Sequence, residues 1–125
     1  MFRTFVFVFP GDREVRQADG ILVCYDCTSR AQFREVASLV PPRDRGHPVV
    51  GLVCTKCDLV ETRQISRAEG EACAAALDAT YWETSALTGQ GVTECFMGLA
   101  RAALRVWART KEMTKEEKEK GCLIA

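Results

Sequence analysis

Two continuous apolar runs, each ending in a polar loop, dominate the pattern of hydrophobic and polar positions along the chain. They cover Gly20–Asp26 and residues 49–54. Unbroken apolar runs of this length are typical of strands that are buried on both faces, as in a parallel sheet. A shorter third strand is predicted over Thr80–Glu83. The pattern therefore predicts a sheet whose central strands are covered by helices on both sides.

Between these strands the apolar positions change to helical spacing. Phe33, Val36 and Val40 fall on one face of a helix that Thr28 or Ser29 can cap. Two prolines at 41–42 end that helix, because proline cannot donate the next backbone hydrogen bond.

Two further helices are predicted downstream. Ser66 can cap a helix over residues 66–77, with Glu69 completing a capping box. A long helix is expected from Val92 to about Met113. Strands that alternate with helices imply right-handed crossovers and an α/β fold with a parallel sheet. The long helix carries a recurrent apolar face: Phe96, Leu99, Ala100, Ala103, Leu104 and Trp107.

The aromatic-rich segment at residues 5–9 has strong strand propensity and ends at a Pro-Gly turn. It either docks beside the strand that contains Ile21 or forms an exposed, aggregation-prone edge. About ten residues separate it from that strand, which is short for a parallel crossover containing a helix. We therefore expect an antiparallel pairing, or none.

Composition narrows the class of protein. The chain has 125 residues, with 17 Lys plus Arg against 17 Asp plus Glu, so nucleic acid is not an expected partner. No apolar run reaches the roughly 18–20 residues that a membrane-spanning helix needs. No secretory signal is recognised at the start. Seven cysteines, an odd number, fit a reduced cytosolic chain better than a disulfide framework.

Four of the cysteines form two CxxC pairs, Cys24 with Cys27 and Cys54 with Cys57. Paired CxxC motifs can hold zinc, and both pairs end strands that we expect to be neighbours. The alternative is that Cys24 and Cys54 are small core residues and the other two are loop thiols. The second interpretation is favoured, because the pairs lack the turn residues of a zinc knuckle.

Two polar motifs follow predicted strands, and the chain ends in a third. They are TKCD at residues 55–58, ETSA at 83–86 and CLIA at 122–125. Open parallel sheets bind their ligands beyond the carboxyl ends of the strands, where the first two lie. In this order the motifs resemble the base-specificity motif, the second base motif and the prenylation box of Ras-superfamily small GTPases. The resemblance runs from about residue 17 to the end.

The resemblance implies a guanine-nucleotide site for GTP or GDP. The carboxylate of Asp58 would accept hydrogen bonds from guanine, and the stem of Lys56 would lie along the base. The Ala86 backbone N–H would donate to the guanine carbonyl oxygen, with Ser85 shaping the turn and Thr55 opening the motif. Most Ras and Rab members have asparagine where Thr55 stands, whereas Rho members have threonine, and Ras members have lysine at the position of Leu87. The subfamily is therefore left open.

The phosphate-binding part of the family pattern has no match in the sequence. No GxxxxGK[ST] loop, no Mg²⁺-binding Ser or Thr and no water-orienting glutamine can be aligned. We therefore expect an incomplete G domain, truncated at its N-terminus, with impaired GTP binding and hydrolysis. The alternative function is a non-catalytic, prenylated interaction module that competes with a full-length GTPase.

Three segments are expected: residues 1–16 as an atypical start, 17–110 as the partial G domain and 111–125 as a charged tail.

Cys122 heads the prenylation box and makes a prenyltransferase an expected partner, with Ala125 favouring farnesyl. The resemblance implies unidentified effectors and regulators. It also implies a location in the cytoplasm and on the cytoplasmic face of membranes.

Overall fold

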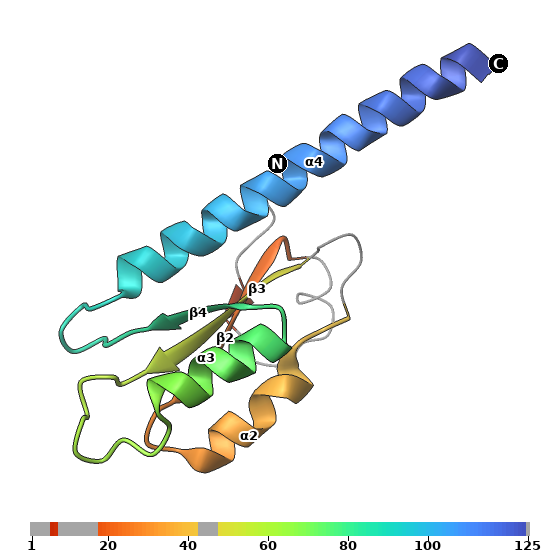
Figure 1. Ribbon diagram of the computed structural model, residues 1–125. Helices are drawn as coiled ribbons and strands as arrows, with labels where there is room; N and C mark the ends of the chain where they lie inside the picture. Colours follow the sequence, from red (N-terminus) through yellow and green to blue (C-terminus); the bar gives the residue numbers. More distant parts are fainter. Residues whose placement is uncertain (1–5, 8–17, 43–47, 125) are drawn as a thin grey trace.

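The computed structural model describes the backbone of residues 6–7, 18–42 and 48–124, and the side chains of 18–42 and 48–109. The predicted α/β fold with a parallel sheet is confirmed (Figure 1). Four strands pair in the order β1-β2-β3-β4. Their bounds are β1 Val6–Phe7, β2 Gly20–Asp26, β3 Val49–Thr55 and β4 Thr80–Glu83; the helices are α2 Arg30–Leu39, α3 Arg67–Ala76 and α4 Val92–Ile124.

The predicted orientation of the N-terminal strand is wrong. Strand β1 pairs parallel to β2, with Val6 opposite Ile21 and Phe7 opposite Leu22. The antiparallel prediction took about ten residues to be too few for a parallel connection. Twelve residues lie between Phe7 and Gly20, and a dozen residues can span up to about 40 Å. That length can join two neighbouring parallel strands, since β1 has only two residues.

The helix boundaries follow the capping residues. Ser29 caps α2 by accepting a hydrogen bond from the backbone N–H of Gln32, and Ser66 caps α3 by accepting from that of Glu69. Helix α2 ends before the prolines, as predicted. Helix α4 runs to Ile124, eleven residues beyond the expected end near Met113, because no proline or glycine interrupts the alternating Lys and Glu residues before Gly121.

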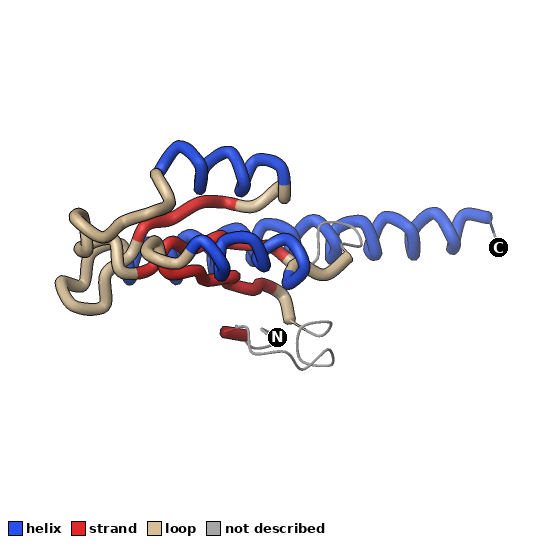
Figure 2. The backbone as a smooth tube through the Cα atoms, turned by 90° about the horizontal axis from the view of Figure 1, so that it is seen from below, coloured by secondary structure: helices blue, strands red, loops and turns tan. Residues whose placement is uncertain are grey.

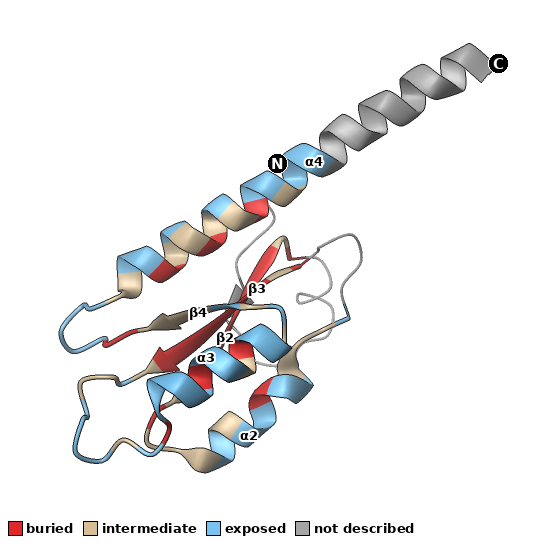
Figure 3. Cartoon of the chain, viewed as in Figure 1, coloured by how far each residue is buried: buried red, intermediate tan, exposed pale blue. Residues whose placement is uncertain are grey.

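The helices cover the two faces of the sheet unequally (Figures 1 and 2). Side chains alternate along β2, so Ile21, Val23 and Tyr25 face α2 and α3, whereas Leu22 faces α4. Each face has its own buried cluster, and the buried positions concentrate on β2 and β3 (Figure 3). Across the described residues, no helix is both long and apolar enough to cross a bilayer.

Helix α4 approaches the sheet closely at one point. A Cβ on Gly98 would meet the indole ring of half-buried Trp82 on β4, so glycine is needed for this contact. Leu99 and Ala103 are fully buried, as the predicted apolar face requires, whereas Leu104 and Trp107 are 44% and 39% exposed. The predicted apolar face of α4 is therefore buried at Leu99 and Ala103 and partly exposed at Leu104 and Trp107.

Candidate functional site

The two motif loops leave the sheet side by side. Strands β3 and β4 are neighbours, and their last paired residues are Cys54 and Glu83. The backbone N–H of Cys57 donates to the carbonyl of Thr84 at 3.1 Å, linking the loops directly. The Ser85 hydroxyl donates to Oδ1 of Asp58 at 2.7 Å. The structure thus brings together two predicted site residues that lie 27 positions apart.

Ser85 organises the second loop. Its side chain is fully buried and its hydroxyl accepts from the Thr88 backbone N–H at 3.2 Å. Its own backbone N–H donates to the Gln90 carbonyl at 3.0 Å, which folds the loop back on itself. Gly91 has φ +71°, and a Cβ there would clash with the Glu83 carbonyl, so this return requires glycine. The loop leaves Ala86 exposed at the edge of the sheet.

Thr55 and Lys56 are tied to the end of β2. The Thr55 hydroxyl donates to the Tyr25 carbonyl at 3.1 Å. Lys56 has a left-handed backbone, with φ 60°, and its ammonium lies 2.9 Å from Oδ2 of Asp26. Sequence reasoning did not select Asp26. The only available signal was its place at the carboxyl end of a strand, next to a strand that is followed directly by a lysine.

A cavity of about 290 Å³ lies beside these loops, between α4 and the sheet. Its walls are mostly apolar and include Leu22, Cys24, Val53 and Phe96. The two motif loops complete the lining with Thr55, Lys56, Thr84 and Ala86. The carboxyl edge therefore combines polar groups on its loops with an apolar hollow adjoining them.

The two CxxC pairs do not form a four-thiol cluster. Cys24 lines the cavity on the α4 face, whereas Cys27 and Cys54 are buried in the cluster beneath α2 and α3. Among the residues that the structure describes, no group of three or more His, Cys, Asp or Glu side chains could hold a metal ion. Desolvation raises the pKa of buried Cys54 to about 11, so it is a neutral thiol near pH 7.

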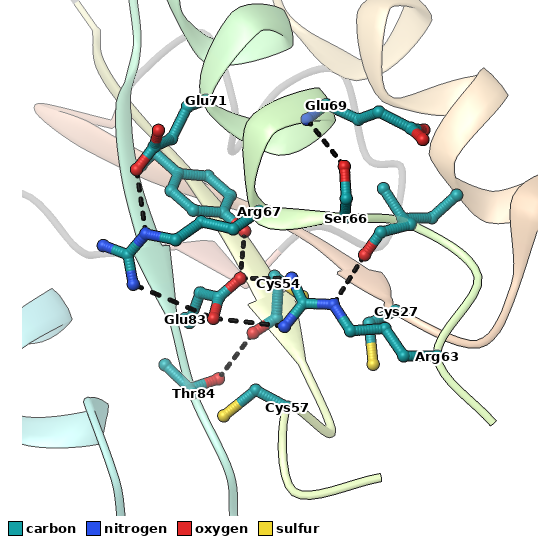
Figure 4. Close-up of polar contacts among 12 residues, drawn as sticks. Cys27, Cys54, Cys57, Arg63, Ser66, Arg67, Glu69, Glu71, Glu83 and Thr84 are labelled. Carbon is teal, nitrogen blue, oxygen red and sulfur yellow. Dashed lines mark hydrogen bonds and ion pairs between the residues drawn. The ribbon is translucent and has the colours of Figure 1, made fainter. Parts of the chain in front are cut away.

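A partly buried ion pair, which the sequence reasoning missed, links the segments that lead into the two motif loops (Figure 4). The guanidinium of Arg63, in the loop after β3, pairs with the carboxylate of Glu83 at the end of β4. Arg63 also donates through Nε to the Ile65 carbonyl at 2.6 Å, and Tyr81 donates to Oε2 of Glu83 at 2.6 Å. The Arg63 hydrogen bonds hold the Glu83 pKa below its usual value, against the opposing effect of burial.

A parallel sheet flanked by helices, with polar loops at its carboxyl edge, is the arrangement of α/β domains that bind nucleotides. The model of the Ras family matches residues 10–105. The chain is 31% identical to Ras-like protein rasB of Dictyostelium discoideum over 90% of its own length, and 33% identical to GTP-binding protein GEM of Mus musculus over 87%. The chain belongs to the Ras family of small GTPases.

A third relative adds to the comparison. The Ras-related and estrogen-regulated growth inhibitor of Bos taurus is 38% identical over 73% of the chain. The chain spans only part of the three relatives: 58% of rasB, 37% of GEM and 48% of the growth inhibitor.

The prediction for Cys122 concerns a side chain outside the described set, although its backbone lies within α4.

Proposed function

We propose that this chain binds the guanine base of GTP or GDP with its two motif loops, as the base-recognition part of a Ras-type domain. The main support is the Ser85–Asp58 hydrogen bond, which fixes the carboxylate of the first motif against the second. The site also lies at the carboxyl edge of a parallel sheet, where such folds bind nucleotides. Family membership agrees with this proposal, since a relative of the chain is named a GTP-binding protein.

The chemistry of the site suits guanine. A carboxylate has about four acceptor positions, and the Ser85 hydroxyl uses one of them on Asp58. The remaining capacity can receive the ring N–H and the exocyclic amine of guanine. Adenine does not present these two donors together, so it would leave the carboxylate unpaired. The backbone N–H of Ala86 would donate to the guanine carbonyl oxygen, and the aliphatic stem of Lys56 would cover part of the base.

The test compares the wild-type chain with Asp58→Asn, which exchanges one carboxylate oxygen for an N–H₂ donor. GDP is titrated into ¹⁵N-labelled protein, and the shifts of the motif-loop amides are followed. Loss of the paired contact should cost about 2–4 kcal/mol of binding free energy, enough to remove saturable binding. ADP serves as the matched control ligand and should not saturate either protein. Equal affinity of wild type and Asp58→Asn for GDP would overturn the guanine site.

The 125-residue chain on its own is proposed to bind GDP weakly, with a Kd of roughly 0.1–1 mM or above, and to hydrolyse no GTP above the uncatalysed rate. Support comes from the sequence, in which no segment matches the phosphate loop or the Mg²⁺ and water-orienting residues. In a longer protein carrying both parts, phosphate and Mg²⁺ contacts would add to the base contacts. A purified sample of this chain that retains stoichiometric nucleotide would contradict the proposal.

We further propose that Cys122 is prenylated and attaches the chain reversibly to cytosol-facing membranes. The residues Leu123, Ile124 and Ala125 supply the aliphatic pair and the terminal residue of a farnesylation box. A single lipid chain gives only marginal membrane binding. The upstream charges add little, since Lys and Arg exceed Glu by only one over residues 109–120. Partial association with membranes is therefore expected.

The test for prenylation expresses wild type and Cys122→Ser in eukaryotic cells. Intact mass of the C-terminal peptide should show a lipid on Cys122, with loss of the three residues that follow. In cell fractionation, a smaller share of the Cys122→Ser protein than of the wild type should be found with the membranes. An unmodified peptide ending in Ala125, or the same membrane fraction for both proteins, would refute lipid attachment.

A further inference from the structure

We infer that Asp26, at the carboxyl end of β2, is a positioning residue that sets the direction of the Lys56 side chain at the guanine site. This inference rests on the proposed function and deepens it. Asp26 lies outside both motifs and reaches Lys56 only because β2 and β3 pair in register, with Asp26 opposite Thr55. The sequence separates the two residues by 30 positions, and the sheet brings their charges together.

The contact with the ammonium is specific. Oδ2 of Asp26 lies 2.9 Å from Nζ of Lys56. The other oxygen, Oδ1, accepts from the Thr28 backbone N–H at 2.8 Å and from the Thr28 hydroxyl at 2.7 Å. The carboxylate side chain is only 13% exposed, whereas that of Lys56 is 59% exposed. A fixed, largely buried acid thus holds one end of an otherwise exposed lysine.

The backbone of Lys56 is held by the same segment. Its carbonyl accepts from the thiol of Cys27 at 3.2 Å and from the Leu59 backbone N–H at 3.0 Å. The Cys27 backbone N–H donates to the Thr55 carbonyl at 3.1 Å. A left-handed backbone at a residue other than glycine persists only where its surroundings impose it. The end of β2 therefore determines where the Lys56 stem starts, and Asp26 determines where it ends.

Fixing both ends matters because lysine has a long, flexible stem. An unrestrained stem would lose its rotamer freedom on contact with the base, whereas a stem already held has lost it beforehand. An ion pair whose ammonium is largely exposed to solvent contributes little to folding stability. The expected consequence of losing Asp26 is therefore weaker ligand binding with the fold retained.

The test uses the full chain and GDP as the probe. Asp26→Asn should weaken GDP binding about 2- to 10-fold, the range expected for freeing one immobilised side chain. Asp26→Glu, which keeps the charge, should restore part of the loss. The matched control is Glu71→Gln, which removes the acid of another 2.9 Å ion pair, with Arg67 on α3, and should bind GDP as wild type does.

A second measurement reports on Lys56 directly. The chain has five lysines, and the other four lie at residues 111–120. In ¹⁵N-lysine NMR, the Lys56 ammonium should give a slowly exchanging signal separate from the others, assigned by its absence in Lys56→Met. The signal should broaden away in Asp26→Asn and persist in Glu71→Gln. A merely structural role of Asp26 would not produce this selective loss.

The outcomes separate the two claims. If Asp26→Asn binds GDP as wild type does while Asp58→Asn fails to bind, the positioning role is wrong and the guanine site stands. If Asp26→Asn weakens binding but keeps the Lys56 signal, Asp26 acts by another route and the inference is overturned. If wild type and Asp58→Asn bind GDP equally, the guanine site fails and this inference fails with it.

Discussion

The two faces of the sheet are built differently. The face beneath α2 and α3 holds eleven of the described buried residues in one cluster, including Ile21, Tyr25 and Leu52. The face beneath α4 holds four, Leu22, Val53, Cys95 and Leu99, and leaves a cavity of about 290 Å³ beside them. The face beneath α2 and α3, called the filled face below, therefore holds the larger buried cluster, and the face beneath α4, the partly filled face, adjoins a cavity.

The two faces also carry different parts of the candidate site. The filled face carries the Arg63–Glu83 ion pair, which joins the loop after β3 to the end of β4 and so fixes the two motif loops. The partly filled face carries the hollow that Thr55, Lys56 and Ala86 border. The ion pair that joins the two loops and the cavity beside them thus lie on opposite faces of the sheet.

The largest expected effect compares two leucines on opposite faces. Leu52→Ala should lower the free energy of unfolding by about 4 kcal/mol, because Leu52 is fully buried in the filled face. Leu22→Ala should cost about 2–3 kcal/mol, because Leu22 already borders the cavity and loses fewer neighbours. Urea denaturation of both variants measures the difference. Equal costs would mean that the two faces are equally well packed.

The second effect concerns the ion pair beneath the loops. The side chains of Arg63 and Glu83 are 19% and 12% exposed, so Glu83→Gln should cost about 2–3 kcal/mol of unfolding free energy. Because the Glu83 pKa is lowered from 4.5 in the folded state, this contribution is present above about pH 4.5 and is lost as the pH falls through the folded pKa. The stabilities of wild type and variant should therefore converge in acid.

The matched control for the ion pair is Glu71→Gln. Its partner Arg67 is 67% exposed on α3, so the change should have little effect on stability at any pH. Chemical denaturation of the three proteins between pH 3 and pH 7 checks both statements. A pH-independent gap between wild type and Glu83→Gln would show that the carboxylate charge is not responsible.

The smallest effect compares two cysteines of the two CxxC pairs. Cys54 is fully buried in the filled face, so Cys54→Leu should be overpacked and cost about 1–3 kcal/mol. Cys24 lines the cavity, so Cys24→Leu should fill space and raise stability by about 0.5–1 kcal/mol. Thermal denaturation should therefore shift in opposite directions. A loss of stability in both variants would indicate that the hollow has no room for a larger side chain.

Much of the fold was predictable from local patterns. The bounds of β2 and β4, the caps Ser29 and Ser66 and the end of α2 before the prolines all agree with the structure. Each depends on residues within one or two turns of one another, where side-chain type and backbone preference act directly. The expected antiparallel pairing of β1 was wrong because strand direction depends on a return path that the pattern does not describe.

Local sequence patterns were enough to locate most strands and helices, the motifs that follow two of the strands, and the family that the chain resembles. Which polar groups meet depends on the three-dimensional packing. Asp58 meets Ser85, Lys56 meets Asp26 and Arg63 meets Glu83, across separations of 20 to 30 positions. Hydrogen bonds and ion pairs act over a few ångströms, so these contacts exist only after the register of the parallel strands has aligned their ends.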